Sequence, residues 1–555
     1  MSVSRCALLA VLVSGLAASA CFAQTSPDAP VASVDAKPLA SLDLFSAGAR
    51  TTGLPASLWK GASADLAHRV LAGLGHQPME PGLAQLARDL LETAAAAPDG
   101  ADADADLAGE RVLSLIRLGD LDAARAILAR SPGVAGRPRL SQAAADLALW
   151  TGDTDRACAV ADTLSDGRDA PYWLQLRAFC QIRAGKPDQA QLALDFAAQS
   201  GARNAQLQHL VAAAQGVRSA GGDPAQASTA LGFAISRLEK ADFSGATPSA
   251  APPALIALST DETQTGDVRR KAAARLLASG AFSAEAVRSA LRAQVGPAPA
   301  APAPQTGLRK GRHADAAAPE SPSDALARDY QAATGAASNL ERASALVRLL
   351  KSAHGAAFRN LCDVIAPELA LVTPDGVNGA DRAMLALAAS VVDASSTSPL
   401  RDGLVPADGV SGVDLALLDA VRDMGAIEQK VSKTASVLVK AGAETVGTEQ
   451  TKAQTGAVLM AAFDLQFSGL SPAERSTFAA FRTGSAIKAA AALSALSSAE
   501  KGATGETALA ALDAASEKGL SVADRALFVR ALSRAGLERN ARSITLDGLL
   551  AVSGH

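Results

Sequence analysis

The sequence predicts an all-α protein, an α-solenoid of stacked helical hairpins arranged in two helical blocks. Three observations support this fold class. The chain of 555 residues is 49% hydrophobic but only 3% aromatic, and it is rich in alanine, the strongest helix former. One short motif recurs at a fixed spacing of 33 residues. The apolar residues around each copy recur every three or four positions, the period of a buried helical stripe.

The recurring motif is a glycine followed by aspartate at the third position and by alanine at the fifth. Its glycines and alanines are Gly119 and Ala124, Gly152 and Ala157, and Gly185 and Ala190. Glycine ends a helix because it adopts the left-handed conformation without strain, and aspartate is expected to cap the next helix. Alanine lets two helices approach closely. The motif therefore predicts three successive helical hairpins.

Residues 107–201, which contain these three copies, resemble a degenerate tetratricopeptide (TPR) array. The turn glycine and the alanine five residues later occupy matching places. The spacing is 33 rather than 34 residues, and the aromatic residues of the fuller pattern are missing. The resemblance implies a protein-binding solenoid and no particular ligand. The chain also resembles alanine-rich helical exported proteins of bacteria, which implies no activity.

The amino terminus has the pattern of a bacterial export signal over residues 1–23. Arg5 precedes an apolar core at residues 7–17, and small residues follow. A cleaved signal implies a periplasmic or secreted protein. Alternatively, Cys21 and the small residues before it resemble a lipobox, which would make Cys21 the lipid anchor of an outer-membrane lipoprotein. Residues 24–50 contain three prolines and are expected to form a flexible tether.

Cysteine usage agrees with export. Beyond the signal region the chain has Cys158, Cys180 and Cys362. Cys158 lies early in the second helix of one expected hairpin, and Cys180 lies in the first helix of the next. Because such helices are neighbours in a repeat array, we expect a disulfide between them. The alternative is a pair of buried free thiols. Cys362 is left unpaired and is expected to be buried.

Composition divides the remaining chain into three parts. We expect a TPR-like solenoid over residues 51–295, a linker rich in proline and alanine over residues 296–324, and a second helical array over residues 325–555. Gly536 is again followed by alanine at the fifth position, Ala541, so the second array is also expected to contain hairpins. After the signal there is no run of 18 uninterrupted apolar residues, so no transmembrane segment is expected.

Charge and motifs argue against several classes of function. The formal net charge of −4 does not favour binding to nucleic acid. The six histidines are scattered without metal-ligand spacing, and neither a phosphate-binding glycine loop nor a nucleophile motif with its required partners occurs. We therefore expect no metal, no cofactor and no catalytic residue.

These observations favour a non-enzymatic periplasmic protein that acts as a scaffold or adaptor for another protein of the cell envelope. One alternative is a lipid-anchored accessory regulator of a cell-wall synthase, and another is a glycan hydrolase with an unrecognised site. Tyr172 and Trp173 follow Pro171 at the start of an expected helix, where one ring points inward and the other outward. This pair is the candidate anchor for a partner. The sequence carries no signal for an oligomeric state.

Overall fold

The computed structural model describes eight stretches of the chain, residues 43–217, 224–295, 321–392, 399–426, 434–463, 469–484, 488–516 and 519–555. Within these stretches the regular elements are helices, with no β-strand and one isolated bridge between Ser63 and Asp99. The predicted all-α class is confirmed. The expectations for the signal peptide, for Cys21, for the tether up to residue 42 and for residues 296–320 lie outside the described residues.

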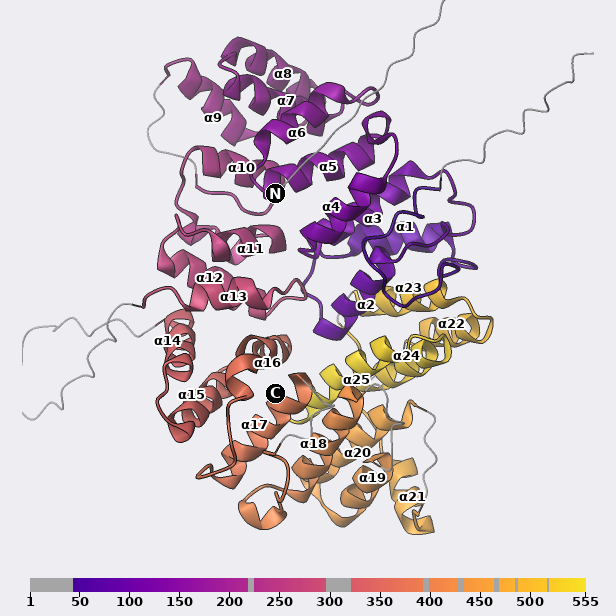
Figure 1. The fold of residues 1–555 in the computed structure, drawn as a ribbon. Helices are drawn as coiled ribbons and strands as arrows, with labels where there is room; N and C mark the ends of the chain where they lie inside the picture. The colour runs from indigo at the N-terminus through magenta and orange to yellow at the C-terminus, as the bar shows by residue number, and fades with distance from the viewer. Residues whose placement is uncertain are drawn as a thin grey trace, which may run out of the picture. The chain divides into compact units, whose positions relative to one another are not determined.

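Thirteen α-helices are described before residue 296 (Figure 1). They are α1 (Ala64–Gly73), α2 (Pro81–Glu92), α3 (Ala105–Arg117), α4 (Leu121–Arg130), α5 (Pro138–Trp150), α6 (Thr154–Thr163), α7 (Pro171–Arg183), α8 (Pro187–Gln199), α9 (Ala205–Ala214), α10 (Ala230–Leu238), α11 (Pro252–Thr260), α12 (Gly266–Leu277) and α13 (Ala284–Leu291). Short 3₁₀ turns lie at Val134–Gly136, Phe243–Gly245 and Thr247–Ser249.

Twelve more α-helices are described after residue 320. They are α14 (Pro322–Thr334), α15 (Asn339–Lys351), α16 (Ala356–Leu369), α17 (Gly379–Val392), α18 (Gly412–Gly425), α19 (Thr434–Glu444), α20 (Gly447–Ala461), α21 (Pro472–Ala480), α22 (Ala489–Glu500), α23 (Thr504–Ala515), α24 (Val522–Arg534) and α25 (Glu538–Val552). A further 3₁₀ turn lies at Pro406–Asp408.

The three motif glycines end helices α3, α5 and α7. Gly119, Gly152 and Gly185 have φ angles of 77°, 80° and 70°, in the left-handed region that favours glycine. The N–H of the residue after each glycine bonds to a carbonyl five residues earlier, at 2.9, 2.8 and 2.9 Å. This Schellman arrangement satisfies the last carbonyl groups of each helix. The predicted helix ends are therefore confirmed.

The aspartates that cap the following helices are not the ones that the motif singled out. Asp120 and Asp153 directly follow their glycines, and their carboxylates accept the backbone N–H three residues further on, both at 3.1 Å. In the third copy Lys186 holds this position without a side-chain cap, and Pro187 begins the helix. The motif aspartates lie inside the first turn, where the helix dipole favours negative charge. The predicted capping role was wrong, because a capping residue precedes the first helical residue.

The motif alanines pack where two helices of a hairpin meet. Ala124, Ala157 and Ala190 are 0% exposed, and α4, α6 and α8 pack back on α3, α5 and α7. Larger side chains fill the space between α5 and α10. Trp150, at the end of α5, is buried with its ring centroid 5.4 Å from that of Phe233 on α10. Small residues therefore allow the close approach inside each hairpin, and large aromatic side chains fill the space between α5 and α10.

The same arrangement recurs near the carboxyl end of the chain. Gly536 has a φ of 82° and lies between α24 and α25, which pack on each other. Ala541, five residues later, is fully buried. The expectation of a helical hairpin at this position is confirmed.

The flexible tether does not extend to residue 50. Leu44 and Phe45 are 4% and 1% exposed, and the Phe45 ring lies edge-on to Trp59 with centroids 6.0 Å apart. The guanidinium group of Arg111 donates to the Phe45 carbonyl at 3.0 Å. Residues 43–50 therefore belong to the core, because two large apolar side chains and a buried cation hold them there.

The predicted linker also ends earlier than expected. Residues 321–324 open α14, with the Ser321 hydroxyl accepting the N–H of Asp324 at 3.2 Å. The Asp324 carboxylate pairs with Arg270 on α12. Helix α13 packs on α16, and residues 42–555 form one compact unit. The helices on either side of residues 296–320 are thus parts of one packed body.

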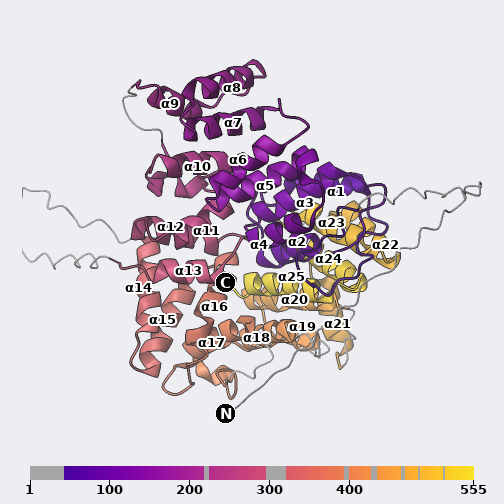
Figure 2. The same ribbon diagram turned by 45° about the horizontal axis from the view of Figure 1, so that its top comes forward.

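The first helices of this unit pack against its last helices. Helix α2 lies along α25, and α1 contacts α23, as both views show (Figure 1 and Figure 2). The approach is close at Gly82, where an added Cβ atom would lie 2.7 Å from the Ser543 carbonyl oxygen. The Asn540 side chain on α25 donates to the buried Asp89 carboxylate on α2 at 2.9 Å. These contacts join residues separated by more than 400 positions in the sequence.

We expect Asp547→Ala to lower the free energy of unfolding by about 3 kcal/mol, since removing one partner of a buried ion pair leaves the other uncompensated. Asp547 on α25 accepts the Gly82 N–H of α2 at 2.7 Å and pairs with Arg359 of α16. Its side chain is 6% exposed. Urea denaturation followed by circular dichroism measures the loss.

Asp513→Ala is the matched control, because its pair with Arg69 also joins an early helix to a late one but is exposed to solvent. The stability of this variant should stay near that of the wild type. Equal loss in both variants would contradict the assignment of a stabilising role to the buried pair.

Candidate binding cleft

A cleft of about 1080 Å³ opens among helices α1, α3, α5, α7, α9, α10, α11 and α12. This volume lies just above the usual range for small-ligand sites. Its lining combines apolar surface with charged and amide side chains. The polar and aromatic lining residues used below are Glu110, Arg117, Arg139, Gln142, Asp146, Trp150, Tyr172, Arg203 and Arg275.

One wall of the cleft is a network of paired charges centred on Glu110 of α3. Arg117 donates to one Glu110 oxygen at 2.7 Å, and the Nε of Arg139 donates to the other at 3.0 Å. Burial raises the pKa of Glu110, but the two guanidinium groups outweigh this and hold the pKa below its ordinary value. Arg117 also donates to the Leu74 carbonyl at 2.7 Å, which ties the end of α1 to α3. Glu110 is therefore ionised and fully engaged.

The network continues to a second carboxylate, Asp146 on α5. Arg139 donates to the Gln142 side chain at 2.9 Å, and Gln142 in turn bonds to Asp146. The Tyr172 hydroxyl of α7 donates to Asp146 at 2.7 Å. Burial raises the pKa of Asp146 to about 6, and these hydrogen bonds limit the rise. Side chains of α3, α5 and α7 are thereby joined along this wall.

The structure separates the two aromatic residues proposed as an anchor. Trp173 is 3% exposed and packs in the core, whereas Tyr172 is half-buried and lines the cleft. Their rings meet edge-on with centroids 4.9 Å apart. One ring thus faces inward and one faces the cleft, which leaves Tyr172 alone as a candidate contact for a partner. Because its hydroxyl holds Asp146, Tyr172 also has a structural role.

Two other arginines of the cleft have no side-chain partner in the part of the chain that the structure describes. Arg203 lies just before α9, and Arg275 lies in the last turn of α12. Both are exposed. Their cationic groups are therefore available to a bound molecule, unlike those of Arg117 and Arg139.

Sequence reasoning identified Tyr172 and missed the four arginines and both carboxylates. These residues come from segments spread over residues 110–275, with no common spacing. Arginine and aspartate are also the usual residues of solvated helix faces, so their type alone does not mark a site. The one local signal was the aromatic pair after Pro171.

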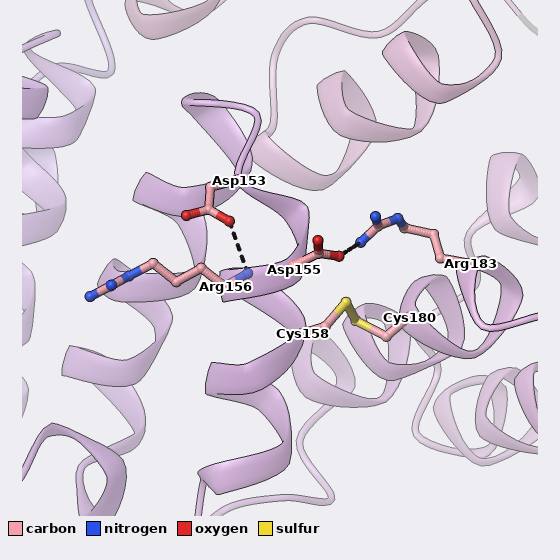
Figure 3. The surroundings of a disulfide bond; sticks show 6 residues. All are labelled: Asp153, Asp155, Arg156, Cys158, Cys180 and Arg183. Carbon is pink, nitrogen blue, oxygen red and sulfur yellow. Dashed lines mark hydrogen bonds and ion pairs between the residues drawn. A yellow bond between two sulfur atoms is a disulfide. The ribbon is translucent and has the colours of Figure 1, made fainter.

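The predicted disulfide is present between Cys158 of α6 and Cys180 of α7, with the Cα atoms 5.7 Å apart (Figure 3). Beside it, the Asp155 carboxylate pairs with Arg183 at 2.8 Å, so α6 and α7 are joined twice. The third cysteine, Cys362, is a buried free thiol, as predicted. Burial raises the pKa of this thiol well above its ordinary value.

Among the described residues, no cluster of three or more histidine, cysteine or carboxylate side chains is placed to hold a metal ion. No described helix is long and apolar enough to cross a membrane. No protein family, curated protein or solved structure matches the chain. The cleft is therefore interpreted from its own residues.

Replacing Cys158 and Cys180 together by serine should lower the free energy of unfolding by about 3 kcal/mol. The bond joins residues with a sequence separation of 22. A crosslink that closes a loop of this length lowers the conformational entropy of the unfolded chain, which corresponds to about 3 kcal/mol. Denaturation with and without dithiothreitol tests the prediction. The reductant should move the wild type to the midpoint of the variant and leave the variant unchanged; an unchanged wild type would contradict it.

Tyr172→Phe should destabilise the protein more at pH 7.5 than at pH 4.5, by about 1–2 kcal/mol at the higher pH. The folded pKa of Asp146, about 6, is above its ordinary value of 3.8. Its contribution to stability is therefore complete below pH 4 and is lost as the pH rises through 6. Without the tyrosine hydroxyl the pKa of Asp146 in the folded protein rises further. The difference in the free energy of unfolding between the variant and the wild type therefore widens from pH 4.5 to pH 7.5. Urea denaturation at both pH values measures it.

Tyr330→Phe is the control, because Tyr330 is buried and its hydroxyl is also hydrogen-bonded, but to Arg292 and not to a carboxylate. We expect the effect of this substitution to change little between the two pH values. A Tyr172→Phe effect that is the same at both values would show that the hydroxyl does not stabilise the ionised form of Asp146.

Proposed function

We propose that this protein is a non-enzymatic scaffold or adaptor that binds another protein of the cell envelope in the cleft lined by α1, α3, α5, α7 and α9 to α12. The observation that carries the proposal is the cleft itself, with the half-buried Tyr172 in its wall and with Arg203 and Arg275, which are exposed and have no side-chain partner among the described residues. Interfaces are enriched in tyrosine and arginine, and a few such residues carry most of the binding energy.

The rigidity of the cleft wall supports this role. Helix α7 is fixed to α5 through the Tyr172–Asp146 hydrogen bond and to α6 through the Cys158–Cys180 disulfide. A wall that is already ordered loses little conformational entropy when a partner binds. Stacked hairpins, moreover, provide extended surfaces suited to binding other chains.

The pattern of residues 1–23, which is typical of an export signal, and the cysteine pair at disulfide distance both support a location in the envelope. Disulfides persist in oxidising compartments and are rare in the cytosol. A lipid anchor at Cys21 would hold the same protein at a membrane surface, and it is the alternative to a freely diffusing form. Both forms are compatible with the cleft as the binding site.

One observation favours a second candidate function, that of a glycan hydrolase. Asp146 has a pKa of about 6 in the cleft, and a carboxylic acid with a raised pKa is what protonation of a leaving group requires. Glu110 would be the second, ionised carboxylate. Its two oxygens, however, are both engaged by arginines. For this reason we prefer the binding function.

A photo-reactive benzoylphenylalanine in place of Ala278 tests the binding function in intact cells of the source organism. Ala278 is exposed and lines the cleft after the end of α12. We expect illumination to give a discrete adduct with one envelope protein, identified by mass spectrometry.

The same group in place of Ala159 is the control, because Ala159 is exposed on α6 but does not line the cleft. This variant should give no such adduct. An equal yield at both positions, or none at Ala278, would contradict the proposal. Clearing of peptidoglycan by the purified protein, abolished by Asp146→Asn, would favour the hydrolase instead.

A further inference from the structure

The side chains of the cleft carry an excess of positive charge. Four arginines and two carboxylates of the described residues line it, so two positive charges remain: Arg117, Arg139, Arg203 and Arg275 against Glu110 and Asp146. The whole chain has a formal net charge of −4. The cleft is therefore a local reversal of the protein's charge, and such a patch attracts anionic groups from solution.

Helix dipoles do not change this sign. Lining residues come from the amino ends of α5, α7, α9, α10 and α11 and from the carboxyl ends of α1, α3, α5 and α12. Each terminus carries about half an elementary charge, positive at the amino end and negative at the carboxyl end. These contributions largely cancel, so the arginine side chains determine the sign of the field.

The two positive charges that remain are the accessible ones. Arg117 and Arg139 are held by Glu110, whereas Arg203 and Arg275 are exposed and have no side-chain partner in the described structure. A guanidinium group pairs with a carboxylate through two parallel hydrogen bonds, which gives direction as well as attraction. The ligand is therefore expected to present carboxylates to these two residues.

The remaining surface indicates what lies between those carboxylates. The Tyr172 ring, Leu231 and Pro252 contribute apolar area to the same cleft. An aliphatic or aromatic side chain would bury this surface, whereas a uniformly charged ligand would leave it uncovered. Carboxylates that flank an apolar group are the chemistry of an acidic peptide segment.

We propose that the cleft binds an extended acidic segment of the partner protein, with Arg203 and Arg275 pairing with its carboxylates and Tyr172 packing against an apolar side chain between them. This inference rests on the proposed function and specifies the chemistry of the partner.

Fluorescence anisotropy of the purified protein tests the proposal with three labelled probes. They are a six-residue peptide of glutamate and leucine, a counterpart with lysine in place of glutamate, and a single-stranded oligonucleotide of six nucleotides. We expect binding of the acidic peptide alone, weakened by added sodium chloride. Combining Arg203→Ala with Arg275→Ala should weaken it about tenfold, as expected for two partly solvated ion pairs.

Arg156→Ala with Arg168→Ala is the matched control, since both residues are exposed arginines outside the cleft. Affinity for the acidic peptide should be unchanged. The variant with both Arg203→Glu and Arg275→Glu should no longer bind the acidic peptide and should bind the basic one. A misfolded variant would not gain binding of the basic peptide.

Equal binding of the acidic peptide by the wild type and the double alanine variant would overturn the inference. So would the absence of acidic-peptide binding, or comparable binding of the oligonucleotide. If the adduct at Ala278 still forms in any of these cases, the proposed function stands and only the acidic chemistry fails. If neither the adduct nor peptide binding is observed, both are wrong.

Discussion

The packing of helix α2 against helix α25 is the contact on which the described arrangement of helices most depends. A helical array normally needs terminal units with a polar outer face, because each end would otherwise expose the apolar stripe meant for the next repeat. Here the early helices cover the late ones. Leu86 and Leu90 of α2 and Ile544 and Leu549 of α25 are fully buried, so both ends contribute to one core.

Buried polar groups add specificity to this largely apolar contact. The buried Asp89 carboxylate accepts hydrogen bonds from Arg50, Gln85 and Asn540. This one carboxylate therefore joins the segment of residues 43–50, α2 and α25. A buried carboxylate is costly unless such donors surround it, and the cost of losing one disfavours other registers of the two helices. The lack of a side chain at Gly82 allows the close approach that these hydrogen bonds require.

The parts of the fold that the sequence predicted are those encoded locally. A turn such as Gly152, with its buried Ala157 and the neighbouring Cys158, depends on residues a few positions apart, so a repeated motif is enough to predict it. The pairing of Asn540 with Asp89 joins residues 451 positions apart and leaves no periodic trace. The capping aspartate was misassigned for a related reason, because two aspartates within four residues satisfy the same propensity rule and only backbone geometry distinguishes them.

Burial divides the charged residues of the cleft into two groups with different roles. Glu110 and Asp146 are partly withdrawn from water, so each needs donors, and the donors Arg139 and Tyr172 join α3, α5 and α7. Arg203 and Arg275 are exposed, so they need no protein donor or acceptor to offset burial. Residue type does not distinguish the groups, which is why a search for motifs finds neither. The paired charges hold the wall of the cleft in place, and the two arginines without a side-chain partner among the described residues leave the cleft with a net positive charge.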